Sequence, residues 1–250
     1  MLSFLLDRRL VVCLCVLCTS ASGQFATAQA TKSSEQLTRA TQFQPRSTLR
    51  LRFMSSTGQP NSGVANVVVR LDSAPKKPKA QKKPVKGMAP ILTLSNRRFN
   101  QLVTVVQPKQ QLQIVNSDGH GYNLTVNGFH NHSFNLIVHP NDSNTISLDR
   151  LESTPVAIES NIHPSARAWL VVTDDDHIGV SDTNGDVFLR DLEAGELQLQ
   201  VWHPEIGRVP LRRTMELAQD KSIVSSKRGQ LSVQLEPGEN NLGSILLAPF

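Results

Sequence analysis

Histidine is the side chain with the widest chemistry in this 250-residue sequence, because imidazole binds metals and exchanges protons near neutral pH. His130 and His132 are separated by one residue, a spacing that can place two imidazoles on Cu(II) or Zn(II). No carboxylate or third ligand follows at a fixed spacing, and the surrounding Asn/Gly/Ser-rich stretch is typical of an exposed polar loop. The seven histidines are His120, His130, His132, His139, His163, His177 and His203.

Two other groupings invite a chemical interpretation. Asp174–Asp176 and the alternating residues at 182–186 contain oxygen ligands for calcium, but the terminal Glu of an EF-hand loop is missing, so we expect solvated turns. Ser165 lies near His163 in the sequence, but no G-x-S-x-G nucleophile elbow accompanies the pair. The sequence therefore predicts that the protein is not an enzyme.

The first 28 residues have the pattern of a secretory signal peptide. Arg8 and Arg9 precede an apolar run too short to span a bilayer, and Ala26 and Ala28 have the spacing that signal peptidase accepts. All three cysteines lie in that run, so the mature chain would hold no disulfide, thiolate nucleophile or cysteine-ligated metal. We expect a secreted or periplasmic protein with no membrane span in its mature form. A lipoprotein anchored at Cys18 is the alternative.

Composition and periodicity together predict an all-β fold. With 39% hydrophobic and 19% charged residues, the chain is neither disordered throughout nor a membrane bundle. After a flexible polar lead-in at 29–46, apolar residues alternate at 48–53, which predicts an edge strand, and 64–71 is β-branched like a buried strand. From residue 90, short apolar segments separated by turn residues are typical of a sandwich or barrel.

The last third of the chain also has β character. Two strands surround Asn184-Gly185, a pair that favours a hairpin turn. The segments 231–235 and 243–247 alternate like two closing strands. We expect Trp169 and Trp202 to fill the core rather than to form a cation-binding site.

One segment, 74–88, is rich in lysine and proline and is predicted to be an exposed loop. It is either a solvated insertion or an electrostatic contact for an anionic polymer or an envelope protein. Nucleic acid is not an expected partner, because no aromatic residues are interleaved for base stacking. The candidate contact residues are Lys76, Lys77, Lys79, Lys82, Lys83 and Lys86.

Two stretches of the sequence carry a family resemblance. Residues 111–118, QLQIVNSD, followed by Tyr122-Asn123, resemble the cupredoxin strand that ends in Asn-x-Asp before a His-Asn pair. Residues 159–164, ESNIHP, are similar to the region that reads Cys-x-x-His-Pro in that family. The resemblance implies a cupredoxin-like Greek-key β-sandwich, which we assign to residues 47–178.

The region that follows carries a second resemblance, which rests on residues 181–185, 192–195 and 201–203. These residues resemble the extension of secreted plastocyanin-like bacterial proteins, including those of planctomycetes. It implies a small β segment similar to the carboxypeptidase regulatory or transthyretin-like fold, which we assign to residues 179–250.

The same resemblance implies a copper site that is largely lost. The two His ligands of a type 1 site fall on Tyr122 and His163, the Cys on Ser160 and the Met near Ala166, so only His163 is retained. A blue-copper centre needs the thiolate. The leading interpretation is a degenerate cupredoxin without a cofactor, which serves as a non-catalytic binding or structural module of the cell envelope. The alternative is a copper-binding electron-transfer or metal-carrier protein with a histidine-only site at His163 and His120. On either interpretation, Tyr122 and Ser160 should lie near His163.

Overall fold

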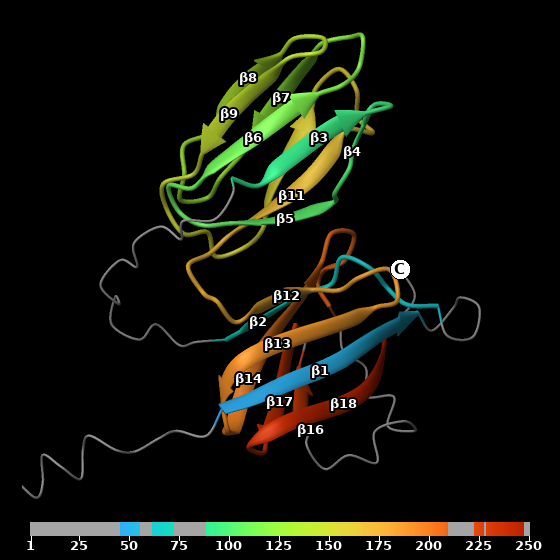
Figure 1. Ribbon diagram of the computed structural model, residues 1–250, viewed down its shortest axis with the longest axis vertical. Coiled ribbons are helices and arrows are strands. Elements are labelled where there is room, and N and C mark those ends of the chain that lie inside the picture. Colours follow the sequence, from blue (N-terminus) through green and yellow to red (C-terminus); the bar gives the residue numbers. More distant parts are fainter. Residues whose placement is uncertain (1–45, 56–61, 73–88, 210–222, 228, 248–250) are drawn as a thin grey trace, which may run out of the picture. The chain divides into compact units, whose positions relative to one another are not determined.

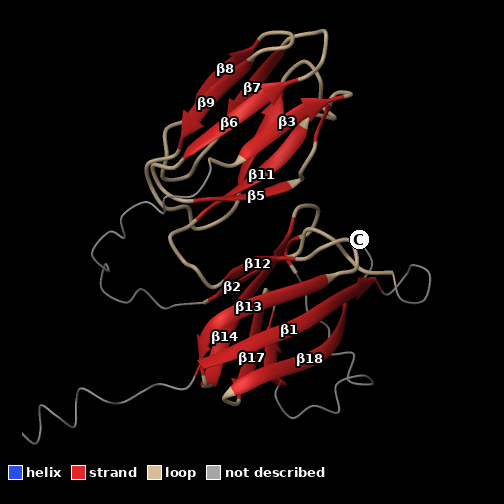
Figure 2. Ribbon diagram, viewed as in Figure 1, coloured by secondary structure: helices blue, strands red, loops and turns tan. Residues whose placement is uncertain are grey.

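The described residues of the computed structural model are 46–55, 62–72, 89–209, 223–227 and 229–247. They form strands and loops without a helix, which confirms the all-β class (Figure 2). No helix in these ranges is therefore long and apolar enough to cross a membrane. The predicted signal peptide, almost all of the polar lead-in and the lysine-rich segment 74–88 lie outside the described residues.

The described strands lie within one compact unit, Pro45–Phe250, and make two sheet pairs that we call the first and second sandwich. The first sandwich holds nine consecutive strands in two sheets, ordered β5-β11-β10-β7-β8 and β4-β3-β6-β9. Figure 1 shows β3, β6 and β9 side by side in one layer. The strands are β3 (Ile91–Ser95), β4 (Arg98–Phe99), β5 (Val103–Val106), β6 (Gln111–Asn116), β7 (Tyr122–Val126), β8 (Phe134–Val138), β9 (Ser143–Ser147), β10 (Val156–Ser160) and β11 (Arg167–Val172).

Alternating side chains build the core of the first sandwich. Leu112 and Ile114 of β6 point inward while Gln111 and Gln113 do not, as a strand with one buried face requires. The same alternation in β7 and β10 brings Leu124 and Ile158 into the same cluster. The strand pairing is long-range and partly parallel, with β3 beside β6 and β5 beside β11.

The second sandwich combines strands from both ends of the described chain. One sheet is β13-β1-β18, and the other is β12-β2-β14-β17-β16, with β15 paired to β14. Alternating Leu49, Leu51 and Phe53 of β1 are fully buried in its core. The strands are β1 (Arg46–Ser55), β2 (Val68–Leu71), β12 (Ile178–Val180), β13 (Asp186–Glu193), β14 (Gly195–His203), β15 (Gly207–Arg208), β16 (Ile223–Lys227), β17 (Gln230–Leu235) and β18 (Gly238–Leu247).

This pairing differs from the domain boundaries expected from the sequence. Residues 47–71 were assigned with the cupredoxin-like strands, but β1 pairs with β13 and β18, and β2 pairs with β12 and β14. β1 is also the middle strand of its sheet rather than an edge strand. Alternation along a strand reports which face is buried, whereas the identity of the partner strand depends on packing that is remote in sequence.

The hairpin expected at Asn184-Gly185 is also absent, because the flanking strands belong to different sheets. Asp182 begins a tight turn in which the N–H of Gly185 donates to the Asp182 carbonyl at 3.0 Å. β12 then pairs with β2, while β13 pairs with β1. The Asn184-Gly185 pair therefore predicted a turn correctly, but it did not predict which strands pair.

Candidate functional site

Two loops of the first sandwich bring His120 and His163 together. His120 lies between β6 and β7, and His163 follows β10. β10 pairs antiparallel with β7, and the N–H of Asn161 donates to the carbonyl of Asn123 at 3.0 Å, so the loop after β10 lies beside the start of β7. Tyr122, the first residue of β7, therefore faces both histidines.

The three rings form a cluster. The centroids of His120 and His163 are 4.6 Å apart, and the Tyr122 centroid lies 5.1 Å from His120 and 5.2 Å from His163. The His120 and Tyr122 rings also share a polar contact, with 3.0 Å between Nε2 and the phenolic oxygen. The sequence-based expectation that Tyr122 lies near His163 agrees with this geometry.

The hydroxyl of Tyr122 is held by the carboxylate of Asp118. The side chain of Tyr122 is 1% exposed, and its hydroxyl donates a hydrogen bond to Oδ2 of Asp118. Burial, with the hydrogen bond to Asp118, raises the pKa of Tyr122 to about 12. The phenol therefore stays protonated at neutral pH and acts as a donor to the carboxylate.

Asp118 is anchored from the other side by backbone. The N–H groups of Asn96 and Arg97 donate to its two oxygens at 2.8 and 3.1 Å. Both residues have positive φ, 53° and 62°, in the tight turn between β3 and β4. The hydrogen bond from Tyr122, together with these backbone donors, holds the pKa of Asp118 below its usual value. Asp118 is therefore an ionised acceptor whose hydrogen-bonding capacity is largely used.

Asn116 explains why an Asn-x-Asp sequence ends β6. Its Nδ2 donates to the carbonyls of His120 and His139, each at 2.8 Å, and its Oδ1 accepts the N–H of Asp118 at 2.9 Å. The side chain is 1% exposed. One buried amide thus fixes the loop that carries both Asp118 and His120, and its role here is structural.

Ser160, which stands where the resemblance would place the thiolate, is a loop anchor. Its Oγ accepts the N–H of His163 at 3.1 Å, and its own N–H donates to the carbonyl of Ala166 at 2.9 Å. Ala166, at the expected methionine position, is fully buried and its N–H donates to the carbonyl of His163. Ser160 and Ala166 therefore close the turn that presents His163.

His163 is half-buried beside two positive or potentially positive groups. Desolvation, followed by the charges of His120 and Arg97, lowers the pKa of His163 below its usual value. A lowered pKa keeps the imidazole neutral near pH 7, and a neutral imidazole can act as an acceptor or as a metal ligand.

The remaining candidates do not join this cluster. His130 and His132 are exposed in the loop between β7 and β8, and His177 is bonded to Asp175. The Asp182–Asp186 stretch is engaged internally, since the carboxylate of Asp186 pairs with Arg52 at 2.7 Å. Within the ranges that the structure describes, no three His, Cys, Asp or Glu side chains are grouped to hold a metal ion.

Sequence reasoning missed Glu152, a buried carboxylate in the loop before β10. It is 4% exposed and accepts the N–H groups of Phe129, His130 and Asn131 and the side-chain amide of Asn131. Burial alone would raise the pKa of Glu152, but these donors lower it below its usual value. Glu152 therefore holds the backbone of the loop that contains Phe129, whose side chain is 81% exposed. An isolated Glu in a loop gives no signal of this role in the sequence.

Comparisons with known proteins found one group of similar solved structures. No family model matches the chain, and neither does any curated protein. Solved structures of amicyanin, a cupredoxin, are similar to it: an oxidised proline-to-glycine variant at 10% identity, and two Cu(I) variants at 12% and 12%. Each alignment covers 36% of this chain and 86% of the amicyanin chain, with a TM-score of 0.31.

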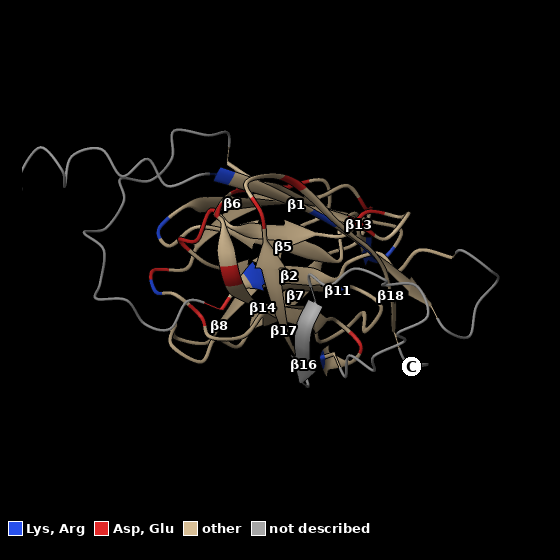
Figure 3. Cartoon of the chain, turned by 90° about the horizontal axis from the view of Figure 1, so that it is seen from below, with Lys and Arg blue, Asp and Glu red and all other residues tan. Residues whose placement is uncertain are grey.

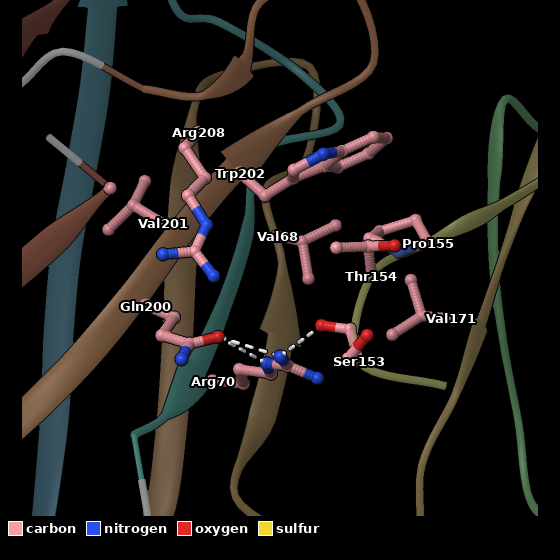
Figure 4. A pocket seen from close by; sticks show the side chains of 11 residues that line it. Val68, Arg70, Ser153, Thr154, Pro155, Val171, Gln200, Val201, Trp202 and Arg208 are labelled. Carbon is pink, nitrogen blue, oxygen red and sulfur yellow. Dashed lines mark hydrogen bonds between the residues drawn. The ribbon is translucent and has the colours of Figure 1, made fainter. Parts of the chain in front are cut away.

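A small pocket beside β2 and β14 is lined by side chains that bond to one another (Figure 4). Arg70 donates to Oε1 of Gln200 at 2.9 and 2.6 Å and to the carbonyl of Ser153 at 2.7 Å. Burial lowers the pKa of Arg70. The cavity volume of about 20 Å³ suits a single water molecule. We therefore assign Arg70 a structural role rather than a ligand-binding one.

Proposed function

We propose that the chain is a secreted, non-catalytic binding or structural module of the cell envelope, in which a cupredoxin-like sandwich has lost its type 1 copper site. The observation that supports this most is the bonding of Tyr122. Its ring fills the space beside His163, and its hydroxyl is bonded to Asp118 and His120. On the alignment that the resemblance implies, this buried and hydrogen-bonded phenol stands at the position of a metal-binding imidazole.

The residues around Tyr122 do not fit a blue-copper centre. Such a centre needs a thiolate, and the sequence holds no cysteine after Cys18. The hydroxyl of Ser160 is engaged with the backbone of the His163 loop. The oxygens of Asp118 are already bonded to two N–H groups and to Tyr122.

Titration of the purified chain with Cu(II) and Zn(II) by calorimetry, with the optical spectrum recorded in parallel, tests the proposal. We expect weak or multiple binding, no intense thiolate-to-copper band, and the same isotherm for His163→Ala. Tight one-to-one binding that His163→Ala abolishes would contradict it.

Tight one-to-one binding that depends on His163 would support the alternative, a metal-carrier or electron-transfer protein with a histidine-only site. The observation in its favour is the 4.6 Å separation of the His120 and His163 rings. Against it stands the contact of His120 with Tyr122, which would have to break before His120 could turn Nε2 toward a shared ion.

Secretion and envelope location rest on the N-terminal pattern of Arg8-Arg9, an apolar run and Ala26-Thr27-Ala28. Fractionation of cells that express the full chain tests this part separately. We expect a product that begins after Ala28 in the envelope or medium. Retention of the intact N-terminus inside the cell would contradict it.

A further inference from the structure

The two tryptophans of the sequence line one open cleft, although they were expected to lie in the core. Trp169 comes from β11 and Trp202 from β14, and both are half-buried. Their rings are in T-shaped contact, with centroids 5.1 Å apart and an interplanar angle of 71°. The cleft has a volume of about 780 Å³, within the size range of small-molecule sites.

The tryptophan rings are supported by packing on their buried side. Each packs against a small buried cluster of Val68, Val103 and Val171 and still borders the cleft. Tryptophan commonly occupies such positions, with an apolar body on the core and a surface left for contacts. A rigid aromatic wall lowers the conformational entropy that binding would cost.

The charged side chains in and beside the cleft indicate which ligand charge it favours. The guanidinium of Arg167 lies 4.7 Å from the Trp169 ring centroid, and its Nε is 3.3 Å from Oε2 of Glu159. A cation therefore already occupies that aromatic face, which disfavours a quaternary ammonium ligand. Glu205 adds one exposed carboxylate to the lining. Basic and acidic positions are interspersed over the described chain, as Figure 3 shows. The cleft lining holds one basic and one acidic side chain, Arg167 and Glu205, so it favours a ligand without net charge.

We propose that this cleft binds a neutral glycan built of pyranose rings. The C–H face of a sugar ring carries partial positive charge and complements the negative face of the Trp202 indole, since Arg167 already lies over the Trp169 ring. Sugar hydroxyls can accept from Arg167 and donate to Glu205, so one ligand uses both the apolar and the polar lining. The inference goes beyond the proposed function and is independent of the copper question, since no residue of the His120–His163 cluster lines the cleft.

Intrinsic fluorescence tests the proposal directly, because the sequence has only these two tryptophans. The probes are cellohexaose, maltohexaose and fully N-acetylated chitohexaose, all of them uncharged, added to the purified full chain. We expect a saturable change in emission with at least one probe, with half-saturation below about 1 mM. Glu205→Gln should weaken binding about tenfold, the cost of one lost hydrogen bond to a charged group. Trp202→Ala should abolish it.

Glu196→Gln is the matched control, an exposed carboxylate on the same strand as Trp202 but outside the cleft lining. Its affinity should equal that of the unmodified chain. If Trp202→Ala fails to fold, Glu205→Gln keeps the test intact, because that side chain is exposed. The proposal is overturned if no probe gives a saturable change, or if Glu205→Gln binds as tightly as the control. It is also overturned if decaproline or tetramethylammonium binds the cleft and the oligosaccharides do not. None of these outcomes bears on metal binding at His163.

Discussion

The hydroxyl of Tyr122 donates a hydrogen bond to the carboxylate of Asp118, and the same oxygen lies 3.0 Å from Nε2 of His120. Asp118 in turn accepts two backbone N–H groups from the turn between β3 and β4. One carboxylate thus joins three segments of the first sandwich. The arrangement makes Tyr122 a structural part of the cluster, and this has measurable consequences.

Tyr122 is the only tyrosine in the sequence, so the ultraviolet absorbance of tyrosinate reports its titration alone. We expect a pKa of about 12, because burial and the bond to Asp118 both oppose ionisation. In Asp118→Asn the pKa of Tyr122 should fall, yet stay above the ordinary value of about 10, since burial persists. Equal pKa values in the two proteins would show that the carboxylate does not act on the phenol.

The pKa of His163 should lie below the ordinary value of about 6.5 when measured by NMR titration. Burial is the main cause, and the neighbouring charges of His120 and Arg97 add to it. His120→Gln should therefore raise the pKa of His163 only part of the way back. The folded state binds this proton less readily than the unfolded chain, so His163 lowers stability slightly as the pH falls through its unfolded pKa. His130→Gln, in the loop at the far end of β7, is the control and should leave the pKa unchanged.

Glu152→Gln should reduce the free energy of unfolding by about 1–3 kcal/mol at pH 7, because buried donors lose a charged acceptor. The pKa of Glu152 is depressed in the folded state, so its contribution is present above the unfolded pKa of about 4.3 and is lost as the pH falls through the lower folded value. Urea unfolding at a series of pH values measures this. The difference between the two proteins should shrink in acid. Glu196→Gln, an exposed carboxylate, should behave like the unmodified chain.

Two glycine substitutions separate steric clash from backbone strain. Gly185 has φ +80°, and a Cβ there would lie 2.0 Å from the carbonyl oxygen of Phe53. Gly195 has φ +123° with nothing within 4 Å of an added Cβ. Gly195→Ala should cost about 1–2 kcal/mol from strain alone, and Gly185→Ala should cost more because the backbone must also move. Equal midpoints in thermal unfolding would contradict the close approach of Gly185 to β1.

The sequence predicted much of the fold because alternation is a local property. Leu49, Leu51 and Phe53 are buried on one face, as their spacing requires. Their partner strands could not be predicted in this way. β18, which pairs with β1 in parallel, lies nearly 200 residues away along the chain, and no local pattern encodes that pairing.

The candidate site was predicted in part, from the family resemblance and not from alternation. The resemblance placed Tyr122, Ser160 and His163 in adjacent loops, and their contacts agree with it. The role of Asp118 was not predicted, although an Asn-x-Asp sequence before a tyrosine was a usable signal. The tryptophan cleft had no signal at all, because Trp169 and Trp202 come from strands of different sheets.

Paramagnetic broadening by Cu(II) tests the central claim most directly. Cu(II) is added in substoichiometric steps while the histidine ring signals are followed by NMR. The exposed pair His130 and His132 serves as an internal reference for adventitious binding. If Tyr122 has replaced the copper site, His163 and His120 should broaden no earlier than this pair. Selective loss of the His163 and His120 signals, complete at one equivalent of Cu(II), would contradict the account.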